Sequence, residues 1–517
     1  MPDVVVQCPA GVFRGRNAIA GDPRGGVDVW KGIRYALAPT GARRWRAPEP
    51  APAQDADAIA FGPAAPQAPS PTIQLGDGTR IDEDCLSLNI WRPAGRGGEA
   101  LPVMVWVHGG AYALGSSAQP LYDGSRLAAE QGVVIVSINY RLGALGFVEM
   151  SAYSTPEQPF DSNIGLRDVL LALRWVQANI AAFGGDPARV TVAGESAGAG
   201  IVTTLLATPA ASGLFARAIA ESSPVSSVYG IPRATGVAER LLAHLGLRPD
   251  AAASARDAPV ESIIAATSAL FAEIPASAPG TLAFAPAVDG DLVPEAPVDA
   301  LRAGRGLPVP LLIGTNRDEA SLFHFMRSPL MPVTDTEIMR MFTQLHAERP
   351  ELALPSVEQV LTAYRGLQPK RRGLAVARDI AFRLPTLWAA EGHAQVADTW
   401  LYRFDLATPA LTLMGIGATH GAELPYVWGN LGTRHTNPAL RLGGRRAAES
   451  ASARLRARWG SFIRGEAPDA TGLPGAAAWP TYRAAGPSLV IDRRDRLADD
   501  LDAALRRAWG DATIAFS

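Results

Sequence analysis

One serine of this chain lies between glycines, at the point where an apolar run gives way to small residues. The stretch VTVAGESAGAG (190–200) holds Gly194, Ser196 and Gly198 in the pattern G-x-S-x-G. A serine held on a tight bend between a strand and a helix can act as a nucleophile, because flanking glycines leave room for the bend and the helix N-terminus brings backbone N–H groups close. A packing turn is the alternative.

A serine hydroxyl attacks a carbonyl carbon efficiently only when a base accepts its proton. Sites with a strand–turn–helix serine carry serine, acid and histidine in that order along the chain, which favours a late histidine. His420 lies in GATHGAELPY beside a glycine, in a loop from which it could reach a distant serine. His346 and His393 lie in helical patterns, where a packed or solvated histidine is the more common finding. We therefore predict His420 as the base.

The imidazole of such a base needs a carboxylate that holds it in one tautomer and orientation. The stretch IGTNRDEASLF (313–323) follows an apolar run and offers Asp318 and Glu319. Both lie at the carboxyl end of a predicted strand, where open α/β sheets place their catalytic groups. An acid in a loop or the first turn of a helix would also explain Asp318, so the pattern leaves both carboxylates as candidates.

The negative oxygen that forms during acyl transfer needs preorganised hydrogen-bond donors. WVHGGAY (106–112) follows another apolar run and contains two successive glycines. Its backbone could approach a substrate closely and present successive N–H groups, which predicts an oxyanion-binding loop. A plain glycine turn is the alternative.

The elements that must position these residues alternate between strands and helices. The stretch 165–185 carries apolar residues at helical spacing and ends at two glycines, which predicts an amphipathic helix. Strand, helix and strand in this order imply a parallel sheet with right-handed crossovers. Short apolar runs predict the buried strands at 101–107, 132–138, 189–194, 308–316 and 399–405.

The remaining stretches extend this α/β pattern. Helical patterns within 320–415, such as 337–347, predict a helical insertion that shapes the pocket over the active site. Residues 493–510 predict a terminal amphipathic helix, and the proline- and alanine-rich segment 47–71 predicts an irregular surface stretch. We find no repeat and no linker, so we expect one α/β domain over residues 1–517.

Composition excludes several classes of protein. The chain has 517 residues, 48% of them hydrophobic, and a net charge of −2, which fits a large core and no nucleic-acid partner. Its apolar runs are strand-sized, so we expect no membrane span. It has two cysteines and no N-terminal signal-peptide pattern, which predicts a cytoplasmic protein. No feature determines the oligomeric state; we favour a monomer.

Together these motifs resemble the type-B carboxylesterase family, which includes bacterial para-nitrobenzyl esterases and, more distantly, the cholinesterases. The resemblance covers nearly the whole chain and implies the α/β-hydrolase fold, a large, mostly parallel sheet flanked by helices. It is carried by the blocks KGIRYALAP (31–39), RWRAPEP (44–50), EDCLSLNIW (83–91), HGGAY (108–112), FGGDPARVTVAGESAGA (183–199), GTNRDEAS (314–321) and THGAELPYVWG (419–429).

The resemblance also implies roles for individual residues. It identifies Ser196 as the nucleophile, His420 as the base and Glu319, rather than Asp318, as the acid. The implied oxyanion donors are the backbone N–H groups of Gly110, Ala111 and Ala197. The implied pocket and supporting residues are Gly109, Glu195 and Ser222. Many relatives have a third glycine where this chain has Ala111.

The implied activity is hydrolysis of carboxylic esters of apolar, aryl or alkyl alcohols, through an acyl-enzyme on Ser196, with water and no metal or organic cofactor. Hydrolysis of a carbamate or amide by the same triad is the alternative. A catalytically silent adhesion protein is a remote third possibility, because such relatives typically lack the serine and this chain has Ser196, Glu319 and His420.

Other features concern the thiols and the pocket. In many secreted relatives the cysteine at Cys85 is paired, but Ala65 stands at its partner's place, so we expect Cys85 to be a buried free thiol. The loop 65–85 has no aromatic residue, so we do not expect choline specificity. We expect pocket walls from 65–85, 270–290 and 320–415, and an apolar approach to the histidine from 409–420.

Overall fold

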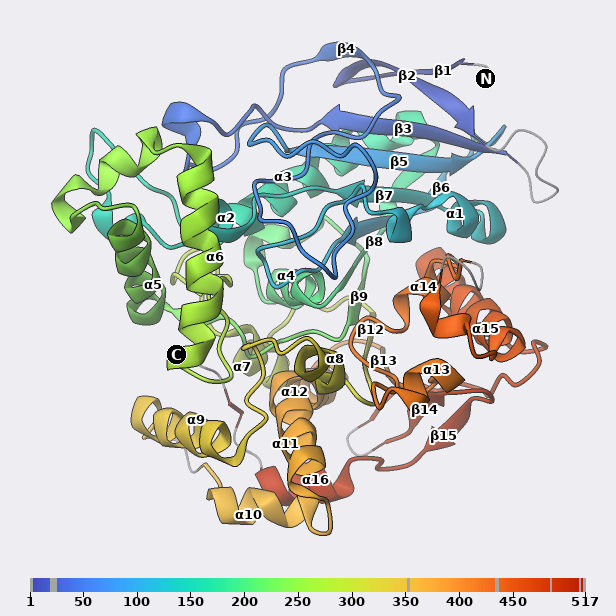
Figure 1. The fold of residues 1–517 in the computed structure, drawn as a ribbon. Coiled ribbons are helices and arrows are strands. Elements are labelled where there is room, and N and C mark those ends of the chain that lie inside the picture. Colours follow the sequence, from blue (N-terminus) through green and yellow to red (C-terminus); the bar gives the residue numbers. More distant parts are fainter. Residues whose placement is uncertain are drawn as a thin grey trace.

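The apolar runs of the sequence form one large twisted sheet in this computed structural model (Figure 1). The structure describes residues 3–18, 26–350, 354–432, 437–483, 486–510 and 513–514. Within these ranges the sheet has 13 strands in the order β1-β2-β3-β5-β7-β6-β8-β9-β12-β13-β14-β15, with β4 paired to β2, while β10 and β11 pair separately.

The strands are β1 Asp3–Cys8, β2 Gly11–Ala18, β3 Val27–Arg34, β4 Gln54–Asp57, β5 Ser87–Pro93, β6 Leu101–Val107, β7 Val134–Ile138, β8 Gly185–Glu195, β9 Arg217–Glu221, β10 Tyr229–Gly230, β11 Ala287–Val288, β12 Leu311–Asn316, β13 Thr399–Phe404, β14 Ser488–Ile491 and β15 Arg496–Ala498. The helices are α1 Ser125–Gln131, α2 Gly143–Phe147, α3 Ile164–Asn179, α4 Ala197–Leu206, α5 Ile231–His244, α6 Val260–Ser277, α7 Pro297–Arg302, α8 Ala320–Phe325, α9 Asp335–Glu348, α10 Val357–Leu361, α11 Pro369–Arg378, α12 Leu384–His393, α13 Pro409–Leu413, α14 Leu424–Val427, α15 Arg445–Arg464 and α16 Ala503–Trp509.

The centre of the sheet is parallel. Strands β7, β6, β8, β9, β12, β13 and β14 pair in parallel along this order, whereas β1, β2, β3 and β5 on one side and β15 on the other pair antiparallel. The predicted mostly parallel α/β sheet is confirmed. The five predicted strand runs correspond to β6, β7, β8, β12 and β13.

Helices cover both faces of this parallel centre. Val103, Val105 and Val107 of β6 belong to the core that includes residues of α3 and α4, whereas Met104 and Trp106 belong to the core that includes residues of α1 and α15. Each large side chain buried in these layers contributes about 1.5–3 kcal/mol. Two buried faces explain why these strands are continuous apolar runs without polar alternation.

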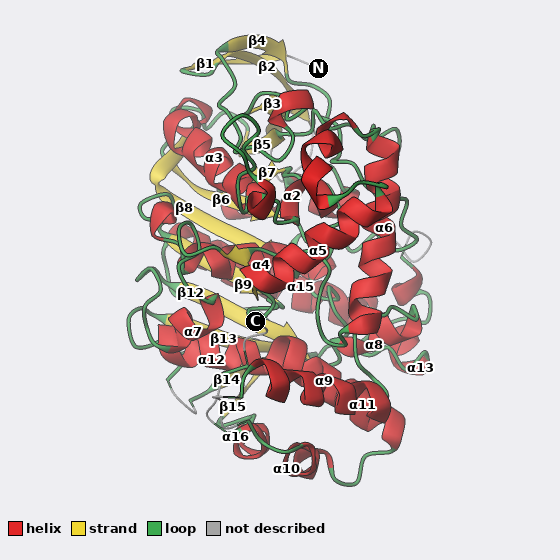
Figure 2. Ribbon diagram, turned by 90° about the vertical axis from the view of Figure 1, so that its left-hand side faces the viewer, coloured by secondary structure: helices red, strands yellow, loops and turns green. Residues whose placement is uncertain are grey.

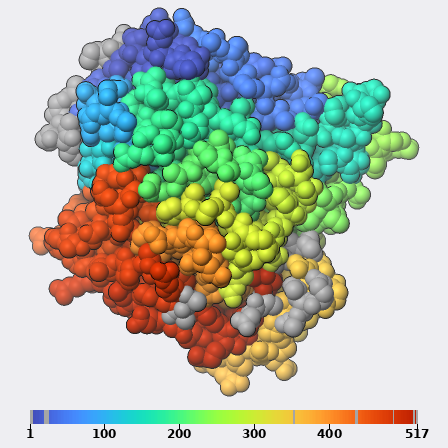
Figure 3. All heavy atoms as spheres, turned by 180° about the vertical axis from the view of Figure 1, so that it is seen from behind, coloured from blue at the N-terminus to red at the C-terminus, as the bar shows by residue number. Residues whose placement is uncertain are grey.

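The chain crosses the molecule from one end of the sheet to the other. The N-terminal strands β1, β2 and β3 lie at one end of the sheet and the C-terminal strands β14 and β15 at the other. The colours of Figure 3 follow the same course, from N-terminal residues at one end of the molecule to C-terminal residues toward the opposite end. The carboxyl ends of the central strands point toward the side that carries α6, α8 and α11 (Figure 2). Any residue that directly follows a central strand is therefore brought to this side.

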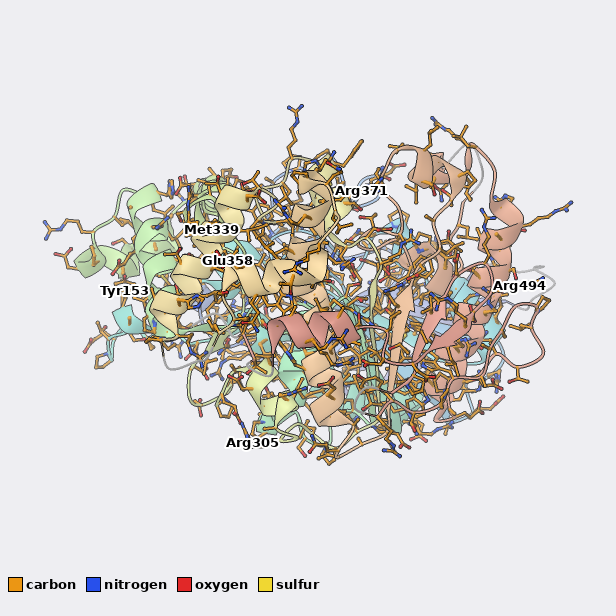
Figure 4. All side chains as sticks on the ribbon, turned by 90° about the horizontal axis from the view of Figure 1, so that it is seen from below. Tyr153, Arg305, Met339, Glu358, Arg371 and Arg494 are labelled. Carbon is orange, nitrogen blue, oxygen red and sulfur yellow. The ribbon has the colours of Figure 1, made fainter. Side chains whose placement is uncertain are left out.

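Residues 320–415 form the helices α8 to α13 and the strand β13. Figure 4 views the molecule from below and labels Met339 of α9 and Glu358 of α10 in this region. The predicted helix at 337–347 is confirmed as α9. The predicted helix at 165–185 is confirmed as α3, followed by a 3₁₀ turn, Ile180–Phe183, that ends at Gly184 with φ 81°.

The predicted terminal helix at 493–510 is wrong in its first half. Residues 496–498 form β15, which pairs antiparallel with β14, and only 503–509 form a helix, α16. The prediction interpreted all of 493–510 as one amphipathic helix, but Leu497 and its neighbours lie at a sheet edge, where pairing with β14 satisfies the backbone. The segment 47–71 is irregular apart from β4, as predicted.

Among the described helices, α6 alone is long and apolar enough by composition to cross a membrane, with a mean hydropathy of 1.2 over 18 residues. It contains Pro275, and its buried face includes Ile263, Leu270 and Ile274. Because α6 packs on α2 and α5, we interpret it as a core-packing helix.

Candidate active site

Ser196 lies on the bend between β8 and α4. Strand β8 ends at Glu195 and α4 begins at Ala197, so Ser196 alone forms the turn, with φ 56° and ψ −125°. A positive φ strains a non-glycine residue and commonly marks functional positions. The Ser196 N–H donates to the backbone oxygen of Glu221 over 2.9 Å, which fixes this turn against β9.

The two glycines of the serine motif allow a close approach of backbones. A Cβ at Gly198 would overlap the carbonyl oxygen of Val107 at the end of β6, and a Cβ at Gly194 would overlap the backbone of Gly198. The α4 N-terminus thus packs directly on the ends of β6 and β8. The pattern G-x-S-x-G is required here for packing as well as for the bend.

Glu319 and His420 form a direct hydrogen bond. His420 Nδ1 lies 2.6 Å from Glu319 Oε2, and the Glu319 side chain is fully buried. Glu319 lies three residues after β12, whereas His420 lies in the loop between α13 and α14. Of the two candidate acids, the structure brings Glu319 to the histidine.

The second oxygen of Glu319 is also held. Its Oε1 accepts hydrogen bonds from Ser222 Oγ and from the Asn316 N–H, both over 2.6 Å. Ser222 directly follows β9 and has a φ of 52°. The carboxyl ends of β9 and β12 thus hold the Glu319 carboxylate in place, and this carboxylate orients the His420 imidazole that is bonded to it.

Asp318 has a different place. Its Oδ2 accepts from the Ala418 N–H over 2.9 Å and from Arg317, and its own N–H donates to the Ala418 oxygen over 2.9 Å. Asn316 Nδ2 also donates to the Thr419 oxygen over 2.7 Å. These bonds tie the loop that carries His420 to the end of β12. The sequence offered no signal for Asn316 or Thr419 beyond their neighbourhood to the predicted acid and base.

The other nitrogen of His420 makes no hydrogen bond to Ser196. Among the described residues, His420 Nε2 has no hydrogen-bond partner, and Glu195 Oε1 lies 3.2 Å from it in ion-pair geometry. Glu195 is buried beside the serine at the end of β8. The imidazole therefore lies between two carboxylates, Glu319 on Nδ1 and Glu195 on Nε2.

These charges control the protonation of the site. Burial lowers the pKa of His420, but the charges of Glu195 and Glu319 and the bond to Glu319 outweigh it, so the pKa is raised above its ordinary value. Burial raises the pKa of Glu195 to about 7, against the opposing effect of His420. The imidazole thus holds its proton more tightly than free imidazole does.

Two more buried glutamates lie near the site. Burial raises the pKa of Glu221 to about 8, although Trp459 Nε1 of α15 donates to it over 2.8 Å. Burial also raises the pKa of Glu423 well above its ordinary value, and Asn316 Nδ2 donates to it. In the described part of the chain, no group of three or more His, Cys, Asp or Glu residues could hold a metal ion.

Three backbone N–H groups lie beside the serine without an acceptor in the described part of the chain: those of Gly110, Ala111 and Ala197. Gly110 has φ 121° and Ala111 has φ 52°. These are the predicted oxyanion donors, and all three residues line the same cavity as Ser196. Gly109 lies against Glu195, since a Cβ there would touch the Glu195 carboxylate.

Ser196, Glu195 and His420 open into a cavity of about 610 Å³. All three predicted stretches contribute to its walls: residues 68–73, then Phe271, Gly280 and Leu282, then 322–323, 326–332 and 380–382. Residues of the glycine loop, with Leu121 and Tyr122, also line it. The predicted apolar approach from 409–420 is wrong, because only His420 of that stretch lines the cavity. Residues 409–413 form α13, and Leu413 is 78% exposed.

Two phenylalanines supply the apolar contact with the histidine instead. The Phe323 and Phe382 ring centroids lie 5.1 and 4.7 Å from that of His420. Phe323 lies on α8, and Phe382 lies in a π-helical turn, Asp379–Arg383, between α11 and α12. Such π turns recur at functional sites. No periodicity in the sequence identified either ring.

Both thiols are free, as expected for Cys85. Cys85 is buried and Cys8 is half-buried, and neither forms a disulfide. Ala65, which stands where the resemblance implies a partner cysteine in many secreted relatives, is buried. Burial raises the pKa of the Cys85 thiol, which makes it a poor nucleophile.

Comparison with known proteins shows which family this chain is similar to. The model of the Carboxylesterase family matches residues 2–508. A para-nitrobenzyl esterase of Bacillus subtilis (strain 168) is 35% identical over 497 residues, covering 95% of this chain and 96% of that protein. A phenmedipham hydrolase of Pseudarthrobacter oxydans is 32% identical over 503 residues, covering 94% of this chain and 96% of that protein. A solved PNB esterase structure superposes with a TM-score of 0.83 at 32% identity, covering 98% of this chain and 99% of that one.

Proposed function

We propose, since this chain belongs to the carboxylesterase family and is a carboxylic-ester hydrolase, that Ser196 is its nucleophile, His420 its general base and Glu319 the carboxylate that orients His420. The observation that carries this proposal is the 2.6 Å hydrogen bond between Glu319 and His420. His420 and Ser196 line one cavity. A nucleophile, a base and an orienting acid are the parts that acyl transfer needs.

Acylation begins when Ser196 Oγ attacks the ester carbonyl carbon and His420 Nε2 accepts its proton. The substrate-free geometry leaves Nε2 without a hydrogen bond, and substrate binding brings the hydroxyl and imidazole into alignment. Glu319 stays ionised and stabilises the imidazolium that forms. The N–H groups of Gly110, Ala111 and Ala197 donate to the developing oxyanion.

Collapse of the tetrahedral intermediate breaks the bond to the alcohol oxygen, which leaves with the proton from His420. Water then enters, gives its proton to His420 and attacks the acyl carbon on Ser196. The second intermediate releases the carboxylic acid and restores the serine hydroxyl. Throughout, the same two hydrogen bonds from Ser222 and Asn316 hold Glu319 in place.

The substrate class follows from the cavity. A space of about 610 Å³ walled mostly by apolar side chains fits esters of aryl or alkyl alcohols. Ala111 has a methyl group that narrows the space beside its N–H, which favours small or linear groups next to the reacting carbon. The loop 68–73 brings no aromatic ring to the cavity, which disfavours cationic choline esters.

The test compares the wild type with Ser196→Ala on para-nitrophenyl acetate, butyrate and octanoate at neutral pH. Loss of at least about 10⁴-fold in kcat is expected, because triad residues act as a unit. Ser212→Ala, an exposed serine outside the cavity, is the control and keeps full activity. A fluorophosphonate probe labels the wild type and the control but not Ser196→Ala.

Activity that survives in Ser196→Ala overturns the assignment. Matched anilide and carbamate analogues of the best ester, with phenmedipham itself as a further substrate, test the alternative of amide or carbamate hydrolysis by the same triad. We expect the ester to be turned over fastest, because its alcohol is the better leaving group.

The organisation and location of the protein follow from the same proposal. One catalytic domain is supported by the single sheet that runs from β1 to β15, with 320–415 as the helical region that shapes the pocket. A cytoplasmic location is supported by the two free thiols, since reducing compartments keep thiols unpaired. We propose a monomer. Gel filtration with light scattering measures the oligomeric state.

A further inference from the structure

The loop after α8 contains a strained arginine. Arg327 has φ 54°, in the left-handed region. Its N–H donates to the His324 oxygen over 3.0 Å, and the Ser328 N–H donates to the Phe323 oxygen over 2.8 Å. These two bonds form a Schellman motif at the end of α8, and Arg327 occupies its left-handed position.

Glycine is the usual residue at that position, because a Cβ there is strained. Other helix ends of this chain follow the rule: Gly132 after α1 and Gly465 after α15 have φ 65° and 93°. Arg327 therefore has a side chain at a left-handed position where the backbone conformation favours glycine. Strained residues of this kind concentrate at functional sites, and Ala111, Ser196 and Ser222 of the proposed site are further cases.

Arg327 also lines the active-site cavity. Besides the phenol of Tyr122, the ionisable side chains among the described lining residues are Glu195, His420 and Arg327. Glu195 and His420 face each other at 3.2 Å, whereas the exposed Arg327 side chain makes no hydrogen bond or ion pair within the described part of the chain. The cavity thus has one cation without a partner.

The position of Arg327 separates it from the reacting atoms. It follows the last residue of α8 (Ala320–Phe325) by two positions, whereas Glu319 directly precedes α8, so the two residues lie at opposite ends of that helix. The Arg327 side chain is exposed, which places it at the open end of the cavity that it lines. Of its chain neighbours on the wall, Met326 and Pro329 are apolar and Ser328 is polar. A guanidinium at the open end of the cavity can bind an anionic group at the far end of a substrate, with an apolar chain between that group and the ester.

We propose that Arg327 is a specificity-determining residue that binds a carboxylate carried on the acyl or alcohol part of the substrate, remote from the ester bond. This inference rests on the proposed function of the same cavity. A carboxylate paired with Arg327 gains a charge-assisted, bidentate hydrogen bond. It also stays away from the buried Glu195, which would repel it. The preferred substrates are thus half-esters of dicarboxylic acids or esters of hydroxy acids.

Two series of substrates test the acyl and the alcohol side. The mono-para-nitrophenyl esters of hexanedioic, octanedioic and decanedioic acids are compared with para-nitrophenyl hexanoate, octanoate and decanoate. The acetate esters of 6-hydroxyhexanoic and 8-hydroxyoctanoic acids are compared with hexyl and octyl acetate, followed by acid release. The measured quantity is the ratio of kcat/KM for each anionic ester to that for its neutral counterpart.

Arg327→Gln is expected to lower this ratio about three- to tenfold in at least one series, through KM, and to leave neutral esters within about twofold. Arg327→Lys keeps part of the preference. Arg494→Gln is the control, because it removes one positive charge from the turn between β14 and β15, outside the cavity lining (Figure 4). Added salt lowers the ratio for the wild type and not for Arg327→Gln.

Arg327→Gly adds a readout that a merely structural arginine would not give. Relief of the positive φ is expected to raise the melting temperature by about 1–2 °C while the anionic preference is lost. An anionic-to-neutral ratio that is the same in the wild type and Arg327→Gln in both series overturns the proposal. Hydrolysis of the neutral esters that does not depend on Ser196 would instead overturn the proposed function, so the two failures are distinguishable.

Discussion

The acid half and the nucleophile half of the proposed catalytic site, Glu319 with His420 and Ser196, are held in place in different ways. Glu319 is fixed by side chains and backbone from three separate elements, and both of its oxygens are hydrogen-bonded. Ser196 is fixed by its own backbone, through one bond to Glu221 and the glycines around it. Its hydroxyl is not bonded to His420 in this state.

The difference shows which contacts must exist before substrate arrives. The buried Glu319 carboxylate already orients the imidazole in the substrate-free protein. No substrate binding energy is therefore needed for this orientation. The contact between Ser196 and His420 can form late, because Glu195 shares the free side of the imidazole at 3.2 Å. A set of substitutions tests this division, half by half.

Loss of the orienting carboxylate is expected to have the largest effect. Glu319→Gln keeps the shape but cannot stabilise the imidazolium, and kcat should fall about 10⁴-fold. Asp318→Asn is the matched control: its partner is the Ala418 N–H, so kcat should fall less than about tenfold. Steady-state kinetics on para-nitrophenyl butyrate measures both. Equal losses in the two variants would contradict the assignment of the acid.

The position of Ser196 should be sensitive to changes in the backbone around it. Gly198→Ala places a methyl group against the Val107 oxygen, so the bend must shift. A 1 Å displacement near the chemistry costs about 10²-fold in rate, and the free energy of unfolding should fall by about 1–3 kcal/mol. Denaturant unfolding and kcat measure the two effects.

Gly236→Ala in α5 is the control for that substitution. Its Cβ meets nothing within 4 Å, so helix propensity should stabilise the protein by up to about 1 kcal/mol with unchanged kcat. If Gly198→Ala behaves like Gly236→Ala, the nucleophile half does not depend on this close approach.

A partial loss in the acid half should be milder. Ser222→Ala removes one donor to Glu319 but leaves the Asn316 N–H. A hydrogen bond to a charged group is worth about 1.5–3 kcal/mol, so stability should fall by that amount and kcat by less than about tenfold. Ser223→Ala, which loses a bond to the neutral Thr203 hydroxyl over 2.9 Å, should leave kcat unchanged. A larger kcat loss in Ser223→Ala would refute the distinction.

The smallest expected effect concerns Glu195, which lies beside the Nε2 atom of the His420 imidazole. Glu195→Gln removes a negative charge 3.2 Å from His420 Nε2. That charge favours the imidazolium and raises the His420 pKa, so its removal lowers the pKa and keeps the base neutral at lower pH. The acid limb of the kcat/KM profile should move down by up to about one pH unit. An acid limb that stays at the same pH or moves to higher pH would show that Glu195 does not raise the His420 pKa.

Much of the fold was predictable because its signals are local. The apolar runs that became β6, β8 and β12 are buried on both faces, so hydrophobicity alone marks them. The first half of 493–510 was mispredicted, because pairing of β15 with β14 joins residues whose sequence carries no strand pattern of its own. Edge pairing depends on the neighbour rather than on the strand itself.

The sequence by itself determined the bend at Ser196, the glycine loop before it and the order of nucleophile, acid and base, because backbone conformation depends on the residues next to it in the chain. The residue pattern alone left Asp318 and Glu319 open and the family resemblance favoured Glu319, but only the tertiary structure shows that Glu319 meets His420 while Asp318 binds the Ala418 N–H. It also placed Phe323 and Phe382 on the imidazole and Arg327 on the cavity wall. Contacts between distant segments depend on how the helices pack over the carboxyl ends of the strands, and that packing is not encoded in any short stretch of sequence.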